Sequence, residues 1–308
     1  MSKQADFQSL IRENCKISII STDHLPELKM EIKNLQEQGQ FDKEFAQQYI
    51  PTFQFNPPEE LRNAKSIIIV AMPRPPTKAV FNWNKKKQPF VLPPTYTAYD
   101  EKRIHIEQLV SDAVGKQGYR VATPRLPLKL VASRSGLGKY GRNNIMYVEG
   151  MGSFMRLTAV YSDIPCEKDQ WQKTQIMTDC KNCDLCQKAC PTGAISSDRF
   201  LLKAERCLTY HNEKKASVPF PDWIKPEWHN CLIGCMLCQA ACPVNRPYLH
   251  SVGEIVEFTE EETKLMLTGV QIEKLPTLLL KKMKLLSLTD YCEELPRNLS
   301  ALLHKSDH

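Results

Sequence analysis

The spacing of the cysteines constrains this chain more than any other feature of its sequence. Nine of the twelve cysteines lie between Cys180 and Cys242, whereas the first 165 residues contain only one. The motif CKNCDLCQKACP places four cysteines in the spacing C-x2-C-x2-C-x3-C-P, and GCMLCQAACP repeats C-x2-C-x3-C-P with one cysteine fewer. This uneven distribution predicts a metal-binding segment that follows a larger domain.

The first spacing is the one that bacterial two-cluster ferredoxins use for [4Fe–4S] centres, where three cysteines bind one cluster and the fourth crosses to the other. We therefore predict two clusters, in which Cys207 supplies the ligand that the second motif lacks and Cys231 is its competitor. The first predicted ligand set is Cys180, Cys183, Cys186 and Cys242, and the second is Cys190, Cys207, Cys235 and Cys238. Zinc is the alternative, although a zinc site needs only two C-x2-C pairs and not the C-x3-C-P extension.

The composition is that of a globular protein, with 42% hydrophobic and 25% charged residues. The first ten residues, MSKQADFQSL, lack the apolar stretch of a signal peptide. The apolar run at 67–72 is too short to cross a membrane. We expect a cytoplasmic protein with no membrane partner, in a compartment where thiols stay reduced. The net charge of +6 permits an acidic partner such as nucleic acid and is weak evidence for one.

Apolar patterns along the chain predict an α+β protein in three parts. Residues 1–170 are expected to form an α/β domain, with strands at 66–72, 118–124, 145–150 and 156–163 and helices at 30–48, 57–65 and 99–118. Residues 73–95 are expected to be a loop, because they carry prolines and a basic run. Residues 171–250 are expected to form a two-cluster ferredoxin-like domain, and residues 251–308 a tail of short helices with breaks at Pro276 and Pro296.

The cysteine motifs and a glycine-containing segment together carry a family resemblance. The segments ASRSGLGKYGRNNIMY (132–147), GSF (152–154) and AVYSDIP (159–165) precede CLTY (207–210) and GCMLCQAACPVN (234–245). This order resembles epoxyqueuosine reductase, the cobalamin-dependent iron–sulfur enzyme of tRNA queuosine synthesis, and more distantly the reductive dehalogenases. The resemblance covers roughly residues 61–245, and faintly the tail segment LPRNLSALL (295–303). It is specific over the eight cysteines and the glycine motif.

The resemblance implies that the N-terminal domain is of the corrinoid-binding type and that electrons pass through the clusters to a cobalamin. An external low-potential donor, such as a ferredoxin or flavodoxin, would supply them. The glycine motif suits such a role, because glycine lets the backbone approach a large ligand. The alternative is an ordinary glycine-rich turn between a helix and a strand. The residues expected to bind the cofactor are Arg134, Ser135, Gly136, Leu137, Gly138, Gly141, Arg142, Asn143, Gly152 and Ser153.

The substrate half of the family pattern is not matched. The family carries an acidic residue, the proton donor, where an ungapped comparison places Ala122, and alanine cannot donate a proton. Tyr99, Asp100, His105 and Lys139 are candidates from residue type and position only, so the catalytic residues are unknown.

The substrate is therefore either a tRNA or a small molecule. A tRNA would need a basic surface, and the run 85–87 beside Trp83 offers one, with a solvated loop as the alternative. Three functions follow: a cobalamin-dependent reductase, a ferredoxin-like electron-transfer protein, and a corrinoid-binding or activating protein with no organic substrate of its own.

Overall fold

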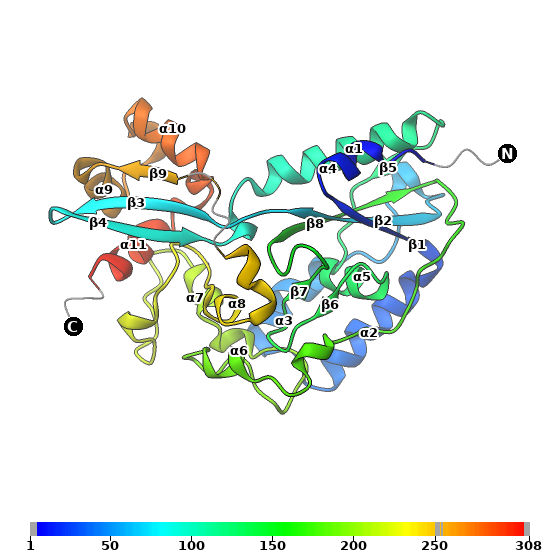
Figure 1. Cartoon of the computed structure of the whole chain (residues 1–308), viewed down its shortest axis with the longest axis horizontal. Coiled ribbons are helices and arrows are strands. Elements are labelled where there is room, and N and C mark those ends of the chain that lie inside the picture. Colours follow the sequence, from blue (N-terminus) through cyan, green and yellow to red (C-terminus); the bar gives the residue numbers. More distant parts are fainter. Residues whose placement is uncertain (1–4, 250–252, 254, 305–308) are drawn as a thin grey trace. The chain divides into compact units, whose positions relative to one another are not determined.

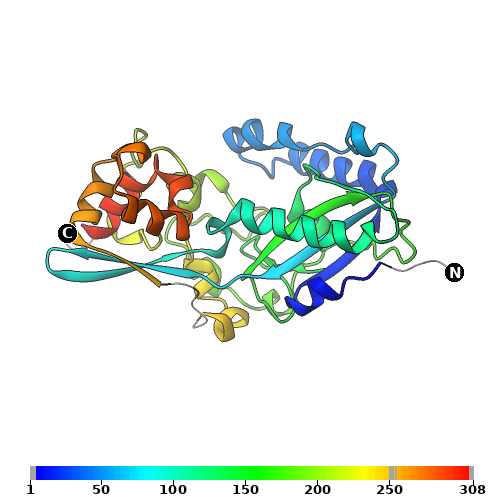
Figure 2. The same ribbon diagram turned by 90° about the horizontal axis from the view of Figure 1, so that it is seen from above.

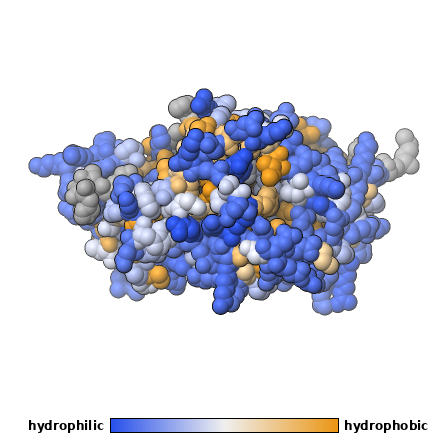
Figure 3. All heavy atoms as spheres, turned by 90° about the horizontal axis from the view of Figure 1, so that it is seen from below, coloured by the Kyte–Doolittle hydropathy of each residue, from blue (hydrophilic) through white to orange (hydrophobic). Residues whose placement is uncertain are grey.

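The computed structural model describes residues 5–249, 253 and 255–304, and it divides into two compact units (Figure 1). Within these ranges, unit 1 contains residues 1–74, 100–184 and 197–202, and unit 2 contains residues 75–99, 185–196 and 203–308. Both units combine helices and strands, which confirms the predicted α+β class. In the described part of the chain, no helix is long and apolar enough to span a membrane. The face drawn in Figure 3 is mostly hydrophilic, with hydrophobic residues in small groups.

Unit 1 is built on a four-stranded antiparallel sheet in the order β1-β2-β8-β5. Helices α1 and α4 cover one face of this sheet, and α2 and α5 cover the other (Figures 1 and 2). A two-stranded sheet, β6-β7, follows α5. The helices of unit 1 are α1 (Gln8–Arg12), α2 (Leu25–Glu37), α3 (Lys43–Tyr49), α4 (Tyr99–Gly115) and α5 (Leu128–Arg134). Its strands are β1 (Lys16–Ser21), β2 (Ser66–Pro73), β5 (Val121–Ala122), β6 (Lys139–Tyr140), β7 (Met146–Tyr147) and β8 (Met155–Ser162).

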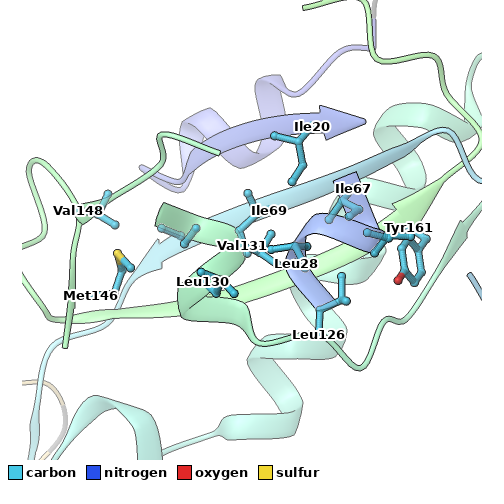
Figure 4. Packing of buried hydrophobic residues seen from close by; sticks show 14 of the residues in the cluster. Ile20, Leu28, Ile67, Ile69, Leu126, Leu130, Val131, Met146, Val148 and Tyr161 are labelled. Atoms are coloured by element: carbon cyan, nitrogen blue, oxygen red, sulfur yellow. The ribbon is translucent and has the colours of Figure 1, made fainter. Parts of the chain in front are cut away.

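Strand β2 forms the centre of unit 1 because its β-branched side chains are buried on both faces, as predicted. Ile67 and Ile69 pack with Leu28 of α2 and Val131 of α5 (Figure 4). The intervening side chains pack on the other face against α4. Each fully buried isoleucine contributes about 1.5–3 kcal/mol relative to an exposed one.

Unit 2 is built on a three-stranded sheet in the order β4-β3-β9. Strands β3 and β4 form an antiparallel hairpin, and β9 pairs with β3 in parallel. Helices α9, α10 and α11 pack their apolar side chains against this sheet (Figures 1 and 2). The strands are β3 (Thr77–Trp83), β4 (Lys86–Leu92) and β9 (Ile255–Phe258). The helices are α6 (Leu185–Lys188), α7 (Leu208–Asn212), α8 (Leu237–Ala240), α9 (Glu260–Leu267), α10 (Thr277–Leu285) and α11 (Leu295–Leu303).

The prediction of a loop at 73–95 is wrong, because most of that segment is the β3–β4 hairpin. Its two central residues, Asn84 and Lys85, have φ angles of +50° and +61°. Positive φ at both positions is typical of the tight turn that joins right-twisted strands. Side chains of β3 alternate between buried and half-buried positions, which is the pattern of a strand with one covered face.

The boundaries predicted at residues 170 and 250 do not coincide with the two units. The hairpin joins the C-terminal part of the chain in unit 2 because β9 pairs with β3 and α9–α11 cover the same sheet. The expected short helices of the tail are present, with Pro276 preceding α10 and Pro296 in the first turn of α11. Residues 251, 252, 254 and 305–308 of that predicted tail, and residue 250 of the predicted ferredoxin-like domain, lie outside the described residues.

The other predicted elements of unit 1 are present with different lengths. The helix expected at 30–48 is two helices, α2 and α3, separated near Gly39, whose φ is +66°. The helix expected at 57–65 is a single 3-10 turn at Glu59–Leu61. The strands expected at 118–124 and 145–150 shorten to the two-residue β5 and β7.

Candidate iron–sulfur centre

All four cysteines of the second predicted ligand set lie in unit 2. Cys190 follows α6, Cys207 immediately precedes α7, and Cys235 and Cys238 lie just before and within α8. Helices α6 and α8, which carry the two cysteine motifs, are in contact. Short helices and tight turns thus bring sulfurs from distant parts of the chain into one region.

The ionisation of Cys207 shows which sulfurs are close to it. Burial, together with negative charge on Cys235 and Cys190, raises the pKa of the Cys207 thiol to about 11. The backbone N–H and hydroxyl of Thr209 donate hydrogen bonds to its sulfur and act in the opposite direction. Burial also raises the pKa of Cys235, with Cys190 adding to the shift. Three of the four predicted ligands of the second cluster are therefore close enough to influence one another.

Cys231, the competing ligand, has a different environment. Its side chain is 1% exposed, and its Sγ donates a hydrogen bond to Asn230 Oδ1 at 3.1 Å. A thiol that donates retains its proton, whereas a cysteine bound to iron is a thiolate and can only accept. This contact supports Cys207 as the fourth ligand.

The first predicted set is divided between the units, with Cys180 and Cys183 in unit 1 and Cys186 and Cys242 in unit 2. In unit 1 the glycine motif holds the segment that leads into the first cysteine. The backbone N–H of Arg142 donates to Cys180 Sγ at 3.4 Å, and its guanidinium donates to the Cys180 carbonyl at 2.6 Å.

Two of the motif's glycines are required by the chain itself. A Cβ on Gly138 would lie 2.6 Å from the Tyr147 carbonyl oxygen and 2.8 Å from Met146 Sδ. A Cβ on Gly141 would lie 2.6 Å from Asn143 Oδ1 and from the Tyr147 ring. These two glycines therefore let their own backbone pack closely against β7 and the residues next to it.

The polar side chains expected to bind a cofactor also have contacts within unit 1. Arg134 is buried, forms an ion pair with Glu27, and lies over the Trp171 ring with its guanidinium carbon 4.2 Å from the ring centroid. Asn143 Nδ2 donates to the Tyr147 hydroxyl at 3.0 Å.

The five other residues of the predicted cofactor site lie on either side of β6 and β7. Ser135 Oγ donates to the Ala132 carbonyl at 3.1 Å, while Gly136 is exposed and Leu137 half-buried. Gly152 and Ser153 are buried in the turn before β8.

Two of the four candidate proton donors, His105 and Asp100, pair with residues outside the motif, whereas Lys139 is exposed in β6 within it. His105 Nε2 lies 2.8 Å from Glu13 Oε1, and Asp100 pairs with Arg103 within α4. Ala122 lies in β5 opposite Tyr161 and is buried in the core.

Helix α11 contributes two residues whose role sequence reasoning missed. Asn298 is 1% exposed, and its Nδ2 donates to the carbonyls of Asn212, at 2.8 Å, and Leu232, at 2.9 Å. Arg297 donates to the carbonyls of His211 and Lys214, each at 2.7 Å. These bonds hold the segments that follow Cys207 and precede Cys235. The only sequence signal was the faint family likeness of LPRNLSALL at 295–303.

The described part of the chain contains no group of three His, Cys, Asp or Glu side chains arranged to hold a single metal ion. All twelve cysteines are described, and none is in a disulfide.

Comparisons with known proteins match the cysteine segment and also a longer stretch of the chain. Residues 179–245 match the family model for a 4Fe–4S double cluster binding domain. The epoxyqueuosine reductase of Burkholderia pseudomallei is 31% identical over 149 residues, which is 46% of this chain and 36% of that protein. The Bacillus subtilis enzyme is 33% identical over 126 residues, covering 41% of this chain and 31% of that protein. Over these stretches the chain is similar to epoxyqueuosine reductases.

Solved structures of the family share the fold. Epoxyqueuosine reductase from Streptococcus thermophilus superposes with a TM-score of 0.67 at 19% identity, over 98% of this chain and 80% of that one. A crystal structure of the enzyme with an epoxyqueuosine-modified tRNA stem loop gives 0.68 at 22% identity, over 94% and 77%. The sequence matches cited above span about a third of each curated relative's length.

Proposed function

We propose that this protein is an iron–sulfur reductase that passes single electrons through two [4Fe–4S] clusters to an acceptor. The observation that carries this proposal is the match of residues 179–245 to a double cluster binding domain. The mutual influence of Cys190, Cys207 and Cys235 in unit 2 supports the assignment of the second cluster. Clusters of this type take up and release one electron at a time at low potential. The donor would therefore be an external low-potential carrier such as a ferredoxin or flavodoxin.

The resemblance implies cobalamin as the acceptor, and the side chains expected to hold it do not fit that role. Arg134, Arg142 and Asn143 already form ion pairs or hydrogen bonds within unit 1, and Gly138 and Gly141 are closed by the chain's own atoms. A corrinoid would have to bind through other groups. This observation favours a second candidate function, in which the protein transfers electrons to a partner without a corrinoid.

The substrate step is proposed to differ from that of the relatives. One solved Bacillus subtilis structure is described as having an aspartate catalytic loop. In this chain the position compared with the family's acidic residue is Ala122, which is buried in β5 and cannot donate a proton. We therefore propose either a different proton donor or a substrate other than epoxyqueuosine in tRNA.

Anaerobic reconstitution with iron, sulfide and cobalamin tests the proposal. Two four-iron clusters give eight iron atoms per chain. A corrin absorption band that stays with the protein after gel filtration would show that a corrinoid binds through other groups. Electron paramagnetic resonance of the reduced protein should show two clusters. Iron below this level in fully folded protein would contradict the two-cluster proposal. Eight irons without a bound corrin would select the electron-transfer protein, and corrin reduction without any further product would select a corrinoid-activating protein.

A further inference from the structure

The side chain of Asn230 has one orientation that satisfies its neighbours. Its Oδ1 lies 2.9 Å from the backbone N–H of Met236, and its Nδ2 lies 3.0 Å from the Trp228 carbonyl. A backbone N–H can only donate and a carbonyl can only accept, so each contact separately assigns the amide oxygen and nitrogen. The thiol of Cys231 donates to the same Oδ1. In the opposite orientation the amide nitrogen would face two other donors, and the amide oxygen would face two other acceptors.

With this orientation fixed, the second N–H of the Asn230 amide points at a predicted cluster ligand. The distance from Nδ2 to Cys235 Sγ is 3.2 Å, within hydrogen-bond range for sulfur. We propose that Asn230 is a positioning residue that raises the reduction potential of the second cluster by donating this hydrogen bond to Cys235. The proposal rests on the proposed function, because it requires that Cys235 bind a cluster.

The direction of the effect follows from charge. A [4Fe–4S] cluster with a 2+ core and four thiolates carries a net charge of about −2, and uptake of one electron makes it about −3 without uptake of a proton. A hydrogen bond to a ligand sulfur stabilises the more negative state more strongly, so it favours reduction. The contact is flanked along the chain by the buried residues Cys231 and Met236. Surroundings of low dielectric constant strengthen such a bond.

A second hydrogen-bond donor would also raise the reduction potential of the second cluster. The hydroxyl of Thr192, which is 3% exposed, lies 3.4 Å from Cys190 Sγ. A thiolate at Cys190 can only accept, so Thr192 would donate. Asn230 is the better residue to test, because its donor role is fixed by two other contacts.

Redox titration of the reconstituted protein, followed by electron paramagnetic resonance, tests the proposal. Asn230→Leu removes the donor at similar size, and Asn230→Asp keeps the acceptor for Met236 while replacing the donor with a charged oxygen. We expect one of the two midpoint potentials to fall. At the potential where the native cluster is half reduced, the ratio of reduced to oxidised cluster in Asn230→Leu should drop about tenfold, which is 59 mV for one electron. Asn230→Asp should fall further.

The matched control is Asn82→Leu, also in unit 2. The native Asn82 amide donates to the Phe258 carbonyl at 2.7 Å, so the variant loses a side-chain hydrogen bond that does not involve a cysteine. Both potentials should stay at the native values in this variant. A full complement of iron with an unchanged potential in Asn230→Leu would overturn the inference. Absence of a second cluster from the native protein would instead overturn the proposed function.

A measurement on the native protein covers the case in which the Asn230 variants do not assemble. Protein labelled with ¹⁵N in asparagine side chains should show a ¹⁵N coupling to one reduced cluster in electron spin echo spectra. No such coupling in native protein with eight irons would refute the hydrogen bond.

Discussion

Replacing Cys207 and Cys231 by alanine, one at a time, tests which of them binds the second cluster. A native chain with both clusters holds eight iron atoms, four in each. Cys207→Ala removes a predicted thiolate, so iron should fall from eight towards four per chain, with the first cluster intact and the second damaged. Cys231→Ala should keep all eight, because the Cys231 sulfur donates to Asn230 and is not among the predicted ligands.

The stability of Cys231→Ala can be worked from its contacts. The substitution removes a side chain that is 1% exposed and a hydrogen bond of 3.1 Å to Asn230 Oδ1. That oxygen keeps the backbone N–H of Met236 at 2.9 Å, so no acceptor is left unpaired. The expected loss is about 1–2 kcal/mol in the free energy of unfolding. The corresponding fall in Tm is about 2–8 °C.

Iron and sulfide analysis after anaerobic reconstitution measures the number of iron atoms per chain. Thermal unfolding of the same samples measures the change in stability. Cys292→Ala is the matched control, since Cys292 is a half-buried cysteine outside both motifs and should retain eight irons. Loss of iron from Cys231→Ala together with full iron in Cys207→Ala would refute the ligand assignment.

Three further outcomes are expected. Asn298→Ala leaves two carbonyls without their donor, so the free energy of unfolding should fall by about 2–4 kcal/mol. A chelator should also remove iron faster, as followed by absorbance. Unchanged stability would contradict the role of α11. Gly138→Ala should destabilise the protein by about 1–3 kcal/mol in denaturant titrations, because the new methyl would clash with the Tyr147 carbonyl oxygen. Gly115→Ala is the control and should not destabilise the protein, because open space surrounds that position. If tRNA is bound through the hairpin turn, Lys85→Gln with Lys86→Gln should weaken binding and reduce its logarithmic salt slope by about 2, measured by filter binding at several salt concentrations; an unchanged slope would exclude this patch.

The features that could be predicted from the sequence are those fixed by neighbouring residues. The cysteine spacing is local, so it indicates a double cluster segment without knowledge of the fold. Strand β2 is likewise evident, because a continuous β-branched run has few alternatives to a buried strand. The helix α4 follows from its own apolar spacing. In each case the deciding signal lies within about twenty residues.

The features that were missed depend on contacts between distant segments. Strand β9 is only four residues long and exists because it pairs with β3, which lies more than 170 positions earlier. The β3–β4 hairpin did carry a local signal, since its side chains alternate, but the prolines around it and the lysines at its turn favoured a loop. The bonds from Asn298 to Asn212 and Leu232 have no local signal, because each spans at least 66 positions.

These long-range contacts explain how the cluster segment is held in shape. Helices α6 and α8 contain four residues each, and α7 contains five, which is too short for a helix that is stable alone. Hydrogen bonds from α11 fix both segments that carry Cys207 and Cys235, and the side chain of Asn230 fixes the turn before α8. The tail therefore supports the segments of the predicted second cluster, although it supplies none of the predicted ligands. Weakening α11 should for this reason release iron from the second cluster before it unfolds unit 1.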